Sequence, residues 1–289
     1  MEGRNDRRGG GNVKQKIRNM SILKFTPHDH KYRSEDGADW SSVTSVISNF
    51  KQPFDADKIA EKSSRNRKSK WYGMTPEEIK HAWKAEANRA TTLGTWYHNC
   101  RESDICSFET MERRGSMIKI FKPIEIDGIK HSPNQKLTDG VYPEHMVYLK
   151  SANICGQSDL VEVVNGEVHI TDYKTNKEIK TEGYTNWEGI TQKMSAPVAH
   201  LDDCHLNHYA LQLSLYMFII LKHNPKLKPG SLSIHHIIFE EAGRDKFDNP
   251  ITALDTNGDP IVTDVVDYDL PYLKKEAIDI VNWLRDQKK

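Results

Sequence analysis

The sequence predicts a mixed α/β protein, in which a mixed β-sheet is flanked by helices and preceded by a helical N-terminal region. Two observations carry this prediction. Helix signals dominate residues 25–115, whereas alternating apolar patterns typical of strands dominate residues 116–175. An apolar helix pattern, a strand pattern and an amphipathic helix pattern then follow, and such interleaving is typical of α/β domains.

Polar capping residues mark the helices of the first part. A Ser or Thr cap precedes a short helix near residue 42, and Thr75-Pro76-Glu77-Glu78 combines a Thr cap, a Pro at the first helical position and acids in the first turn. The expected helices cover residues 42–47, 55–70 and 76–90, and a further one starts near Leu93 and includes His98 and Glu102.

Alternating residues predict strands in the middle of the chain. The expected strands cover residues 117–121, 144–149, 158–164, 167–174 and 232–239. The dipeptide Asn165-Gly166 separates two of them, and it is the strongest short signal for a β-hairpin because both central residues of such a turn need a positive φ.

The remaining segments differ in polarity. Residues 176–203 are polar and irregular, which is typical of a long functional loop. Apolar residues predict a buried helix over residues 206–222, and residues 271–287 have the spacing of an amphipathic helix.

Composition excludes several classes of protein. The chain has 289 residues and four irregularly spaced cysteines, so it is not a disulfide scaffold. No apolar run reaches the roughly 18 residues of a membrane span, and the N-terminus lacks the apolar core of a secretory signal. We therefore expect a cytoplasmic protein that does not contact a membrane.

Charge is balanced in total but unevenly distributed. There are 41 basic and 41 acidic residues. Residues 1–24 hold seven bases and two acids, residues 62–70 hold five bases and no acid, and the stretch 248–269 is acidic. Residues 1–24 are expected to form a basic, disordered tail, followed by a helical region over 25–115 and the core over 116–289. The basic segments suit either phosphate contacts or an ordinary solvated surface.

The expected hairpin brings two carboxylates together. If Asn165 and Gly166 form a two-residue turn, Asp159 lies opposite Asp172 with Cβ atoms about 4.5–5.5 Å apart. Like charges at that spacing destabilise a sheet, whereas a bound Mg²⁺ or Mn²⁺ would reverse the effect. Lys174 shares the face of Asp172 and could hold a water or offset charge on a phosphate. The set suits metal-assisted phosphodiester hydrolysis; the alternative is a surface hairpin with an ordinary Asp172–Lys174 ion pair.

Four blocks in the chain resemble the PD-(D/E)XK nuclease superfamily, and within it the RecB-like exonuclease branch. They are Gly94-Thr95-Trp96-Tyr97-His98, Gly156-Gln157-Ser158-Asp159, Asp172-Tyr173-Lys174-Thr175 and Gln212-Leu213-Ser214-Leu215-Tyr216. Val43-Thr44-Ser45-Val46 is similar to an N-terminal block of mitochondrial genome maintenance exonucleases. The resemblance spans roughly residues 40–240. Ser158 stands where the superfamily name has Pro, which the RecB-like branch tolerates.

This resemblance implies a restriction-endonuclease-like core and a role for each matching residue. His98, Asp159, Asp172 and the backbone carbonyl of Tyr173 would bind the metal, and Lys174 would position or activate the attacking water. Residues implied to support the site or to contact the substrate are Gln212, Tyr216, Glu144 and Thr175. Glu102 lies one turn after His98 on the same face of the expected helix, where it could support His98 or be an ordinary surface acid.

Other metal sites are not expected. The residues His200, Cys204, His205 and His208 resemble a zinc cluster, but they lack a Cys-x-x-Cys pair. The four cysteines are scattered, unlike those of the iron–sulfur subgroup of RecB-like nucleases. We therefore expect neither structural zinc nor an iron–sulfur cluster.

The resemblance implies a Mg²⁺- or Mn²⁺-dependent deoxyribonuclease, with an exonuclease on DNA ends or single-stranded DNA as the main expectation. Such an enzyme would serve replication, recombination or repair, as in phage relatives. The sequence has no phosphate-binding loop of the G-x-x-x-x-G-K-[ST] type, so a separate helicase or single-strand-binding protein would be its partner. Two alternatives stay open: a catalytically silent nucleic-acid-binding module and a site-specific endonuclease.

Overall fold

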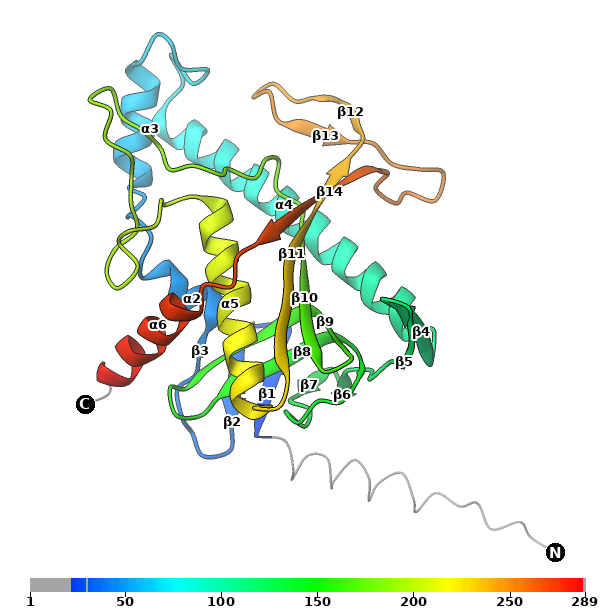
Figure 1. The fold of residues 1–289 in the computed structure, drawn as a ribbon. Helices are drawn as coiled ribbons and strands as arrows, with labels where there is room; N and C mark the ends of the chain where they lie inside the picture. Colours follow the sequence, from blue (N-terminus) through cyan, green and yellow to red (C-terminus); the bar gives the residue numbers. More distant parts are fainter. Residues whose placement is uncertain (1–21, 30, 288–289) are drawn as a thin grey trace, which may run out of the picture.

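The computed structural model describes residues 22–29 and 31–287 and contains a central sheet of six strands (Figure 1). Its strands are β3 (Ser41–Ser42), β8 (Gly140–Leu149), β9 (Ile154–Val164), β10 (Glu167–Lys174), β11 (Lys228–Phe239) and β14 (Val262–Leu270). The order is β14-β11-β10-β9-β3, and β8 also pairs with β9. The β10–β11 and β3–β9 pairs are parallel and the others antiparallel. The expected mixed α/β class is therefore confirmed.

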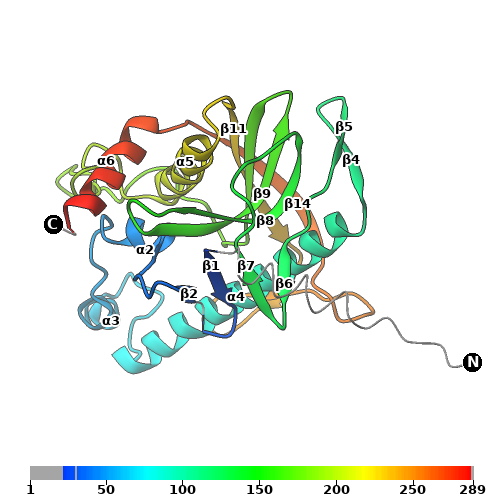
Figure 2. The ribbon, with the colours of Figure 1, turned by 90° about the horizontal axis from the view of Figure 1, so that it is seen from below.

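Helices cover both faces of this sheet. The helices are α2 (Val43–Ser48), α3 (Ala56–Arg65), α4 (Pro76–Cys106), α5 (His205–His223) and α6 (Lys274–Asp286). The views in Figures 1 and 2 place α5 and α4 on opposite sides of the sheet. The larger core joins α2, α5 and α6 to one face, and a smaller core joins Ile105 of α4 to the other.

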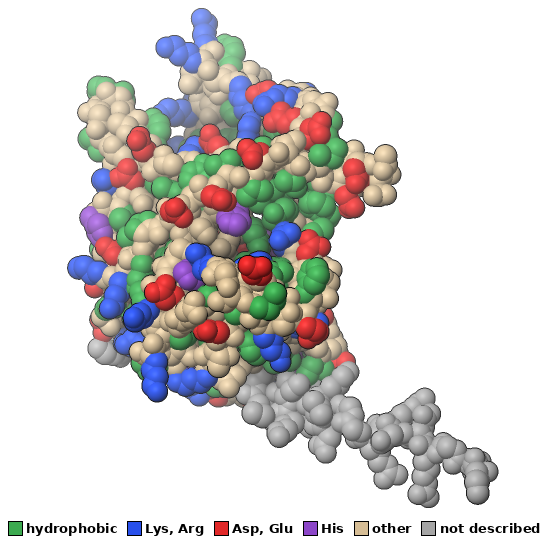
Figure 3. Space-filling model, turned by 45° about the vertical axis from the view of Figure 1, so that its right-hand side comes forward, with side chains coloured by type: hydrophobic (Ala, Val, Ile, Leu, Met, Phe, Trp, Pro, Cys, Tyr) green, Lys and Arg blue, Asp and Glu red, His purple; other side chains and the backbone are tan. Residues whose placement is uncertain are grey.

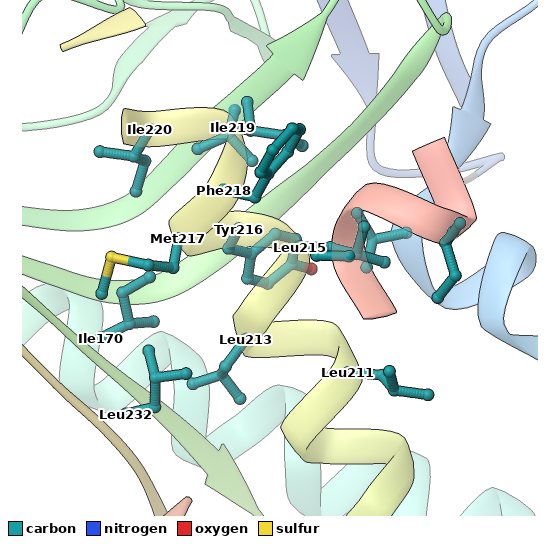
Figure 4. Close-up of a cluster of buried hydrophobic side chains, with 14 of the residues drawn as sticks. Ile170, Leu211, Leu213, Leu215, Tyr216, Met217, Phe218, Ile219, Ile220 and Leu232 are labelled. Atoms are coloured by element: carbon teal, nitrogen blue, oxygen red, sulfur yellow. The ribbon is translucent and has the colours of Figure 1, made fainter. Parts of the chain in front are cut away.

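The apolar helix α5 is the centre of the larger core. Residues 210–220 of α5 are all buried, and Figure 4 shows their side chains beside Ile170 of β10 and Leu232 of β11. A helix that is apolar on nearly every side can be stable only when it is surrounded. The sequence therefore predicts α5 well, within one residue at each end.

Smaller sheets and hairpins surround the central sheet. One has the order β2-β1-β7-β6, and the other two are the pairs β12–β13 and β4–β5. Their strands are β1 (Leu23–Thr26), β2 (Lys31–Ser34), β4 (Thr110–Arg113), β5 (Ser116–Lys119), β6 (Ile124–Ile126), β7 (Ile129–His131), β12 (Glu241–Arg244) and β13 (Pro250–Thr252). Strands therefore also occur in the region 25–115, which was expected to be helical.

The expected turn and its register are confirmed, but the expected direct pairing of Asp159 with Asp172 lies beyond the end of the ladder. Asn165 and Gly166 have φ angles of 52° and 77°, as the tight turn requires. The ladder pairs Glu167 with Val164 and ends at Thr171 and Leu160. The expected caps are confirmed as well: the side chains of Ser42 and Thr75 accept hydrogen bonds from the first turns of α2 and α4.

Several expected helix boundaries are wrong. The helices expected over 76–90 and from Leu93 are one helix of 31 residues, α4. The intervening Thr91 and Thr92 do not break it, because their hydroxyls donate to the carbonyls of Ala87 and Asn88 one turn earlier.

The helix expected over 55–70 is α3, and it ends at Arg65. The Asn66 side chain accepts a hydrogen bond from the Lys68 backbone N–H, which favours a turn over a helix. The last helix begins at Lys274 instead of 271. The loop expected over 176–203 contains no helix or named strand.

Of the two basic segments in the sequence, one lies wholly within the described residues. The basic residues 62–70 lie at the end of α3 and in the turns that follow, whereas residues 1–21 of the expected basic tail lie outside the described residues. On the face drawn in Figure 3, basic and acidic side chains are interspersed. Within the described part of the chain, no helix combines the length and apolar character needed to cross a membrane.

A close approach at Gly156 generates the first prediction. A Cβ atom at this position would lie 2.6 Å from Cε1 of Tyr216, which is 3 % exposed and cannot easily move. Gly156→Ala should therefore lower the free energy of unfolding by roughly 1–3 kcal/mol, as measured by urea denaturation.

Two further variants control this measurement. Gly94→Ala meets only Thr175 Oγ1, at 3.2 Å, and lies inside α4, so it should leave stability equal or higher by up to about 1 kcal/mol. Adding Tyr216→Leu to Gly156→Ala should recover part of the loss. Wild-type stability of Gly156→Ala would contradict the close packing of Tyr216.

Candidate metal centre

The candidate site lies at a gap in the pairing of β9. One edge of β9 pairs with β8 from residue 154 to residue 163. On the other edge, β3 pairs with residues 154 and 155, and β10 pairs with residues 160–164. The segment Gly156-Gln157-Ser158-Asp159 lies between these two partners. It is therefore a place where side chains from other elements can reach the sheet.

Three potential metal ligands meet beside this gap: His98 of α4, Glu144 of β8 and Asp159 of β9. Nδ1 of His98 lies 3.4 Å from Oδ1 of Asp159 and 3.7 Å from Oε1 of Glu144. One donor atom from each residue lies within 4.8 Å of the others. This is the one such group of three found in the described residues.

The sheet places Glu144 and Asp159 next to each other. The pairs Pro143–Leu160 and His145–Ser158 flank them on β8 and β9, so the two acids occupy opposite positions. Glu144 has a φ of 49°, an unusual conformation for a residue other than glycine, and such residues cluster at functional sites. Its Oε2 also accepts a hydrogen bond from the Gln157 amide.

The backbone of Tyr173 orients both His98 and Asp159. Its N–H donates to Oδ2 of Asp159 at 2.8 Å, and its carbonyl oxygen lies 3.3 Å from Nε2 of His98. When Nε2 carries a proton and donates it to that carbonyl, Nδ1 presents its lone pair toward the two carboxylates. The Tyr173 carbonyl, which was expected to bind the metal, thus contacts Nε2 of His98, whereas Nδ1 faces the two carboxylates.

The charge of His98 follows from the same contacts. Burial favours a lower pKa for the ring, but hydrogen bonds and attraction to Asp159 and Glu144 outweigh it and raise the pKa of His98 to about 11. In the metal-free protein the imidazolium therefore offsets the two adjacent carboxylates. A divalent cation in the same place would remove the need for that proton.

These donors fit a hard divalent cation. Two carboxylates and one imidazole are ligands that Mg²⁺ and Mn²⁺ accept, and they include no thiolate of the kind that selects softer metals. All three side chains are buried or half-buried, so folding has already removed much of the water around them before an ion binds. His98, Glu144 and Asp159 are therefore the residues that would hold the ion.

Asp172, which was expected to bind the metal, is not one of the three clustered donors. It lies with Lys174 on the α5 side of β10. The two side chains form an ion pair, and Nε2 of Gln212 donates to Oδ1 of Asp172 at 3.4 Å and to the Tyr216 hydroxyl at 3.3 Å. Burial and the charge of Asp159 raise the pKa of Asp172.

Lys174 remains a cation in this environment. Burial alone favours a lower pKa, but Asp172 and Asp159 outweigh it, so the pKa of Lys174 lies above its ordinary value. The ammonium also lies 4.9 Å from the centroid of the Tyr209 ring. Lys174 is therefore suited to attract an anion and not to accept a proton.

The remaining expected residues surround these groups. Glu102 lies one turn after His98 on α4 and pairs with Lys130 at 3.1 Å, and Lys130 is also 3.8 Å from Glu144. The Thr175 hydroxyl donates to the carbonyl of Ala90. Glu102 therefore acts on the site through Lys130, and Thr175 joins the end of β10 to α4.

Sequence reasoning missed three of these contacts. Gln157 carries no charge that would mark it as a site residue, although its side-chain amide donates a hydrogen bond to Glu144. Lys130 is joined to the site only by the folding of β7 against the rest of the protein, so no local signal could have found it. Tyr209 precedes Gln212 by three residues on α5, and that helical spacing could have placed it beside Lys174.

The residues that resemble a zinc cluster make separate contacts. Nε2 of His200 lies 3.0 Å from Glu276, and Nε2 of His208 lies 2.6 Å from Asp203. The backbone N–H of Lys180 donates to Nδ1 of His205, and the Cys204 thiol donates to the carbonyl of Thr181. These contacts attach the loop of residues 176–203 to α5 and α6.

Comparison with protein-family models, with curated proteins and with solved structures found no match to this chain. The function is therefore inferred from the side chains of the site and from the geometry that holds them.

Binding of Mn²⁺ should release a proton from His98. The metal takes the neutral imidazole, whereas the pKa of about 11 keeps His98 protonated at neutral pH without metal. Binding should therefore release about one proton, and the affinity for Mn²⁺ should rise about tenfold for each unit of increasing pH between pH 6 and 8. Titration calorimetry in two buffers of different ionisation enthalpy measures the proton release.

Two histidine variants test the assignment. His98→Asn should weaken Mn²⁺ binding and abolish the proton release. His200→Asn removes a histidine that is also paired with a carboxylate but lies outside the metal centre, and it should leave both quantities unchanged. The same proton release in His98→Asn and in the wild type would exclude His98 as a ligand.

Proposed function

We propose that the protein is a divalent-metal-dependent deoxyribonuclease of the PD-(D/E)XK superfamily with a restriction-endonuclease-like core, close to the RecB-like exonucleases. One observation carries the proposal. Residues of four motif blocks far apart in the sequence meet beside the unpaired edge of β9 between β3 and β10: His98, Asp159, the Asp172–Lys174 pair and the Gln212–Tyr216 pair. Each block alone has an ordinary structural explanation, but their meeting does not follow from folding of the individual elements.

His98, Glu144 and Asp159 would hold Mg²⁺ or Mn²⁺. Such an ion, when bound, polarises the phosphate and lowers the pKa of a coordinated water. The protein's own contribution is orientation: Tyr173 fixes Asp159 and the His98 ring through its backbone, and Gln157 and Lys130 fix Glu144.

Lys174 would stabilise negative charge that develops on the phosphate during hydrolysis. Its raised pKa keeps the ammonium charged, and the Asp172 carboxylate holds it beside the metal centre. A fixed cation in a partly dry site stabilises such charge more strongly than the same cation in water. Gln212 in turn fixes Asp172, which gives the Gln-x-x-x-Tyr block a positioning role.

DNA ends or single strands are the proposed substrate. The positive charge of residues 62–70 at the end of α3 supports a phosphate-binding role. Exonuclease action is the part of the proposal that depends most on the resemblance, and site-specific endonuclease action is its alternative. A test on linear and circular DNA separates the two.

Cleavage should depend on Asp159 and on the added metal. Asp159→Asn should reduce the rate of DNA hydrolysis with Mg²⁺ by more than about 100-fold, because even outer partners of a metal site contribute about 10–100-fold. Glu167→Gln is the matched control, since it removes an exposed acid from the turn end of the same hairpin. The measurement uses labelled linear and circular substrates, single- and double-stranded, with circular dichroism to verify folding.

Three results would contradict the proposal. They are full activity of Asp159→Asn, activity that survives excess chelator, and a wild type that cleaves none of the substrates with either metal. Degradation of linear but not circular DNA would support an exonuclease, and cleavage of circles would support the endonuclease alternative.

The basic segment after α3 should contribute to DNA binding. Lys62, Arg67 and Lys68 are exposed. Each phosphate contact on a single strand contributes about −0.7 to the slope of log affinity against log salt. The triple variant Lys62→Gln, Arg67→Gln, Lys68→Gln should therefore bind single-stranded DNA more weakly and flatten the slope by about 2.

Fluorescence anisotropy at several salt concentrations measures that slope. Lys274→Gln with Lys275→Gln on α6 removes positive charge elsewhere and should change the slope little. An unchanged slope in the triple variant would show that the basic segment is an ordinary solvated surface.

A further inference from the structure

A cavity of about 540 Å³ adjoins the candidate metal centre. Its walls come from residues 119–124, from residues 130–138 and from the middle of β8. Glu144 belongs both to this wall and to the metal centre, and Lys130 lines the cavity and contacts Glu144. Whatever occupies the cavity therefore lies directly beside the proposed metal.

The wall of the cavity is rich in lysine, although Lys130 is paired with Glu102 and Glu144. Four lysines line it, against one acid. The lysines are Lys119, Lys122, Lys130 and Lys136, and the acid is Glu144.

The positive charge of this wall is only partly neutralised. Lys136 donates to the neutral carbonyl of His223. Lys122 pairs with Glu109, whose side chain is 79 % exposed, and such a surface pair is weak. Lys119 contacts the Phe121 ring and forms no ion pair with a described residue.

An aromatic pair forms another part of the wall. Phe121 and Tyr142 are stacked with centroids 4.6 Å apart and planes at 4°. The Tyr142 hydroxyl donates to the carbonyl of Thr138 and accepts from its N–H, which fixes the pair. Lys119 lies 5.5 Å from the Phe121 centroid. The Lys119 ammonium thus lies over the aromatic ring.

A combination of cations and an aromatic ring can bind the phosphates and the base of an unpaired nucleotide. Proteins bind unpaired nucleotides by stacking the base on an aromatic ring and by placing cations along the phosphates. The volume lies within the range of about 300–1,000 Å³ typical of small-ligand sites, which suits one nucleotide better than a stacked duplex. His145 adds a buried polar group to the wall, and its Nε2 has no hydrogen-bond partner in the described structure.

We infer that this cavity binds one unpaired nucleotide of the DNA strand that is cut at the metal centre, an inference that rests on the proposed nuclease function. The base would lie against Phe121, and its phosphates would contact Lys119 and Lys122. A strand held in this way enters the site as a single strand.

The test measures binding of 5′-phosphorylated tetrathymidylate in EDTA by titration calorimetry, so that no cleavage occurs. Lys119→Gln with Lys122→Gln should weaken binding roughly tenfold, and Phe121→Leu should weaken it about fivefold or more. Lys274→Gln with Lys275→Gln is the matched control, because it also removes one lysine without an ion pair and one paired with a surface acid. The control should bind like the wild type.

Each outcome is decisive. Wild-type affinity in both cavity variants, equal weakening in the α6 control, or equal competition by a blunt duplex without unpaired nucleotides would overturn the inference. Binding of thymidine monophosphate as tight as that of tetrathymidylate would indicate a site for free nucleotides and would overturn it as well.

The same measurements separate this inference from the proposed function. If the wild type cleaves DNA but the cavity variants bind normally, the nuclease proposal stands and the cavity assignment fails. If tetrathymidylate binding depends on the cavity residues but no substrate is cleaved, the nuclease proposal fails and the cavity remains a nucleotide site.

Discussion

The incomplete pairing of one edge of β9 is the constraint on which the site depends. Between β3 and β10, residues 156–159 lie beside no strand on that edge. Buried backbone groups need partners, and here one partner is a side chain: the N–H of Tyr173, just past the end of the β9–β10 ladder, donates to Asp159. Tyr216 of α5 closes the same gap by packing on Gly156. The end of the β9–β10 ladder thus leaves the Tyr173 backbone free to contact both Asp159 and His98.

Charge balance gives this arrangement a second rationale. Formally, Glu144, Asp159 and Asp172 carry three negative charges, and Lys174 supplies one positive charge. A protonated His98 leaves one negative charge, whereas a divalent cation together with neutral His98 leaves none. Because burial makes uncompensated charge costly, the metal-bound form would be the balanced one. Lys130 and Glu102 form a separate pair beside these groups.

Local signals explain which parts of the structure the sequence predicts. The turn at Asn165-Gly166 determines the β9–β10 register, and with it the proximity of Asp159 and Asp172, because turn and strands are contiguous. The caps of α2 and α4 are equally local. The sequence predicted two helices where α4 is one, because the hydroxyls of Thr91 and Thr92 find hydrogen-bond partners within the helix. The gap in β9 and the approach of Lys130 depend on pairings between distant segments, which no short pattern encodes.

The unbroken length of α4 links two distant parts of the molecule mechanically. Near its start it contacts α3, where Lys80 pairs with Asp57, and later in the same helix it carries His98. At 1.5 Å per residue, Lys80 and His98 are about 27 Å apart along the axis. The first turn of α3, which carries Asp57, and His98 of the candidate metal centre are therefore held at a spacing set by helix geometry rather than by a loop. That spacing can change only in the steps of a helix: one added residue turns His98 by about 100°, and only three or four move it by a whole turn.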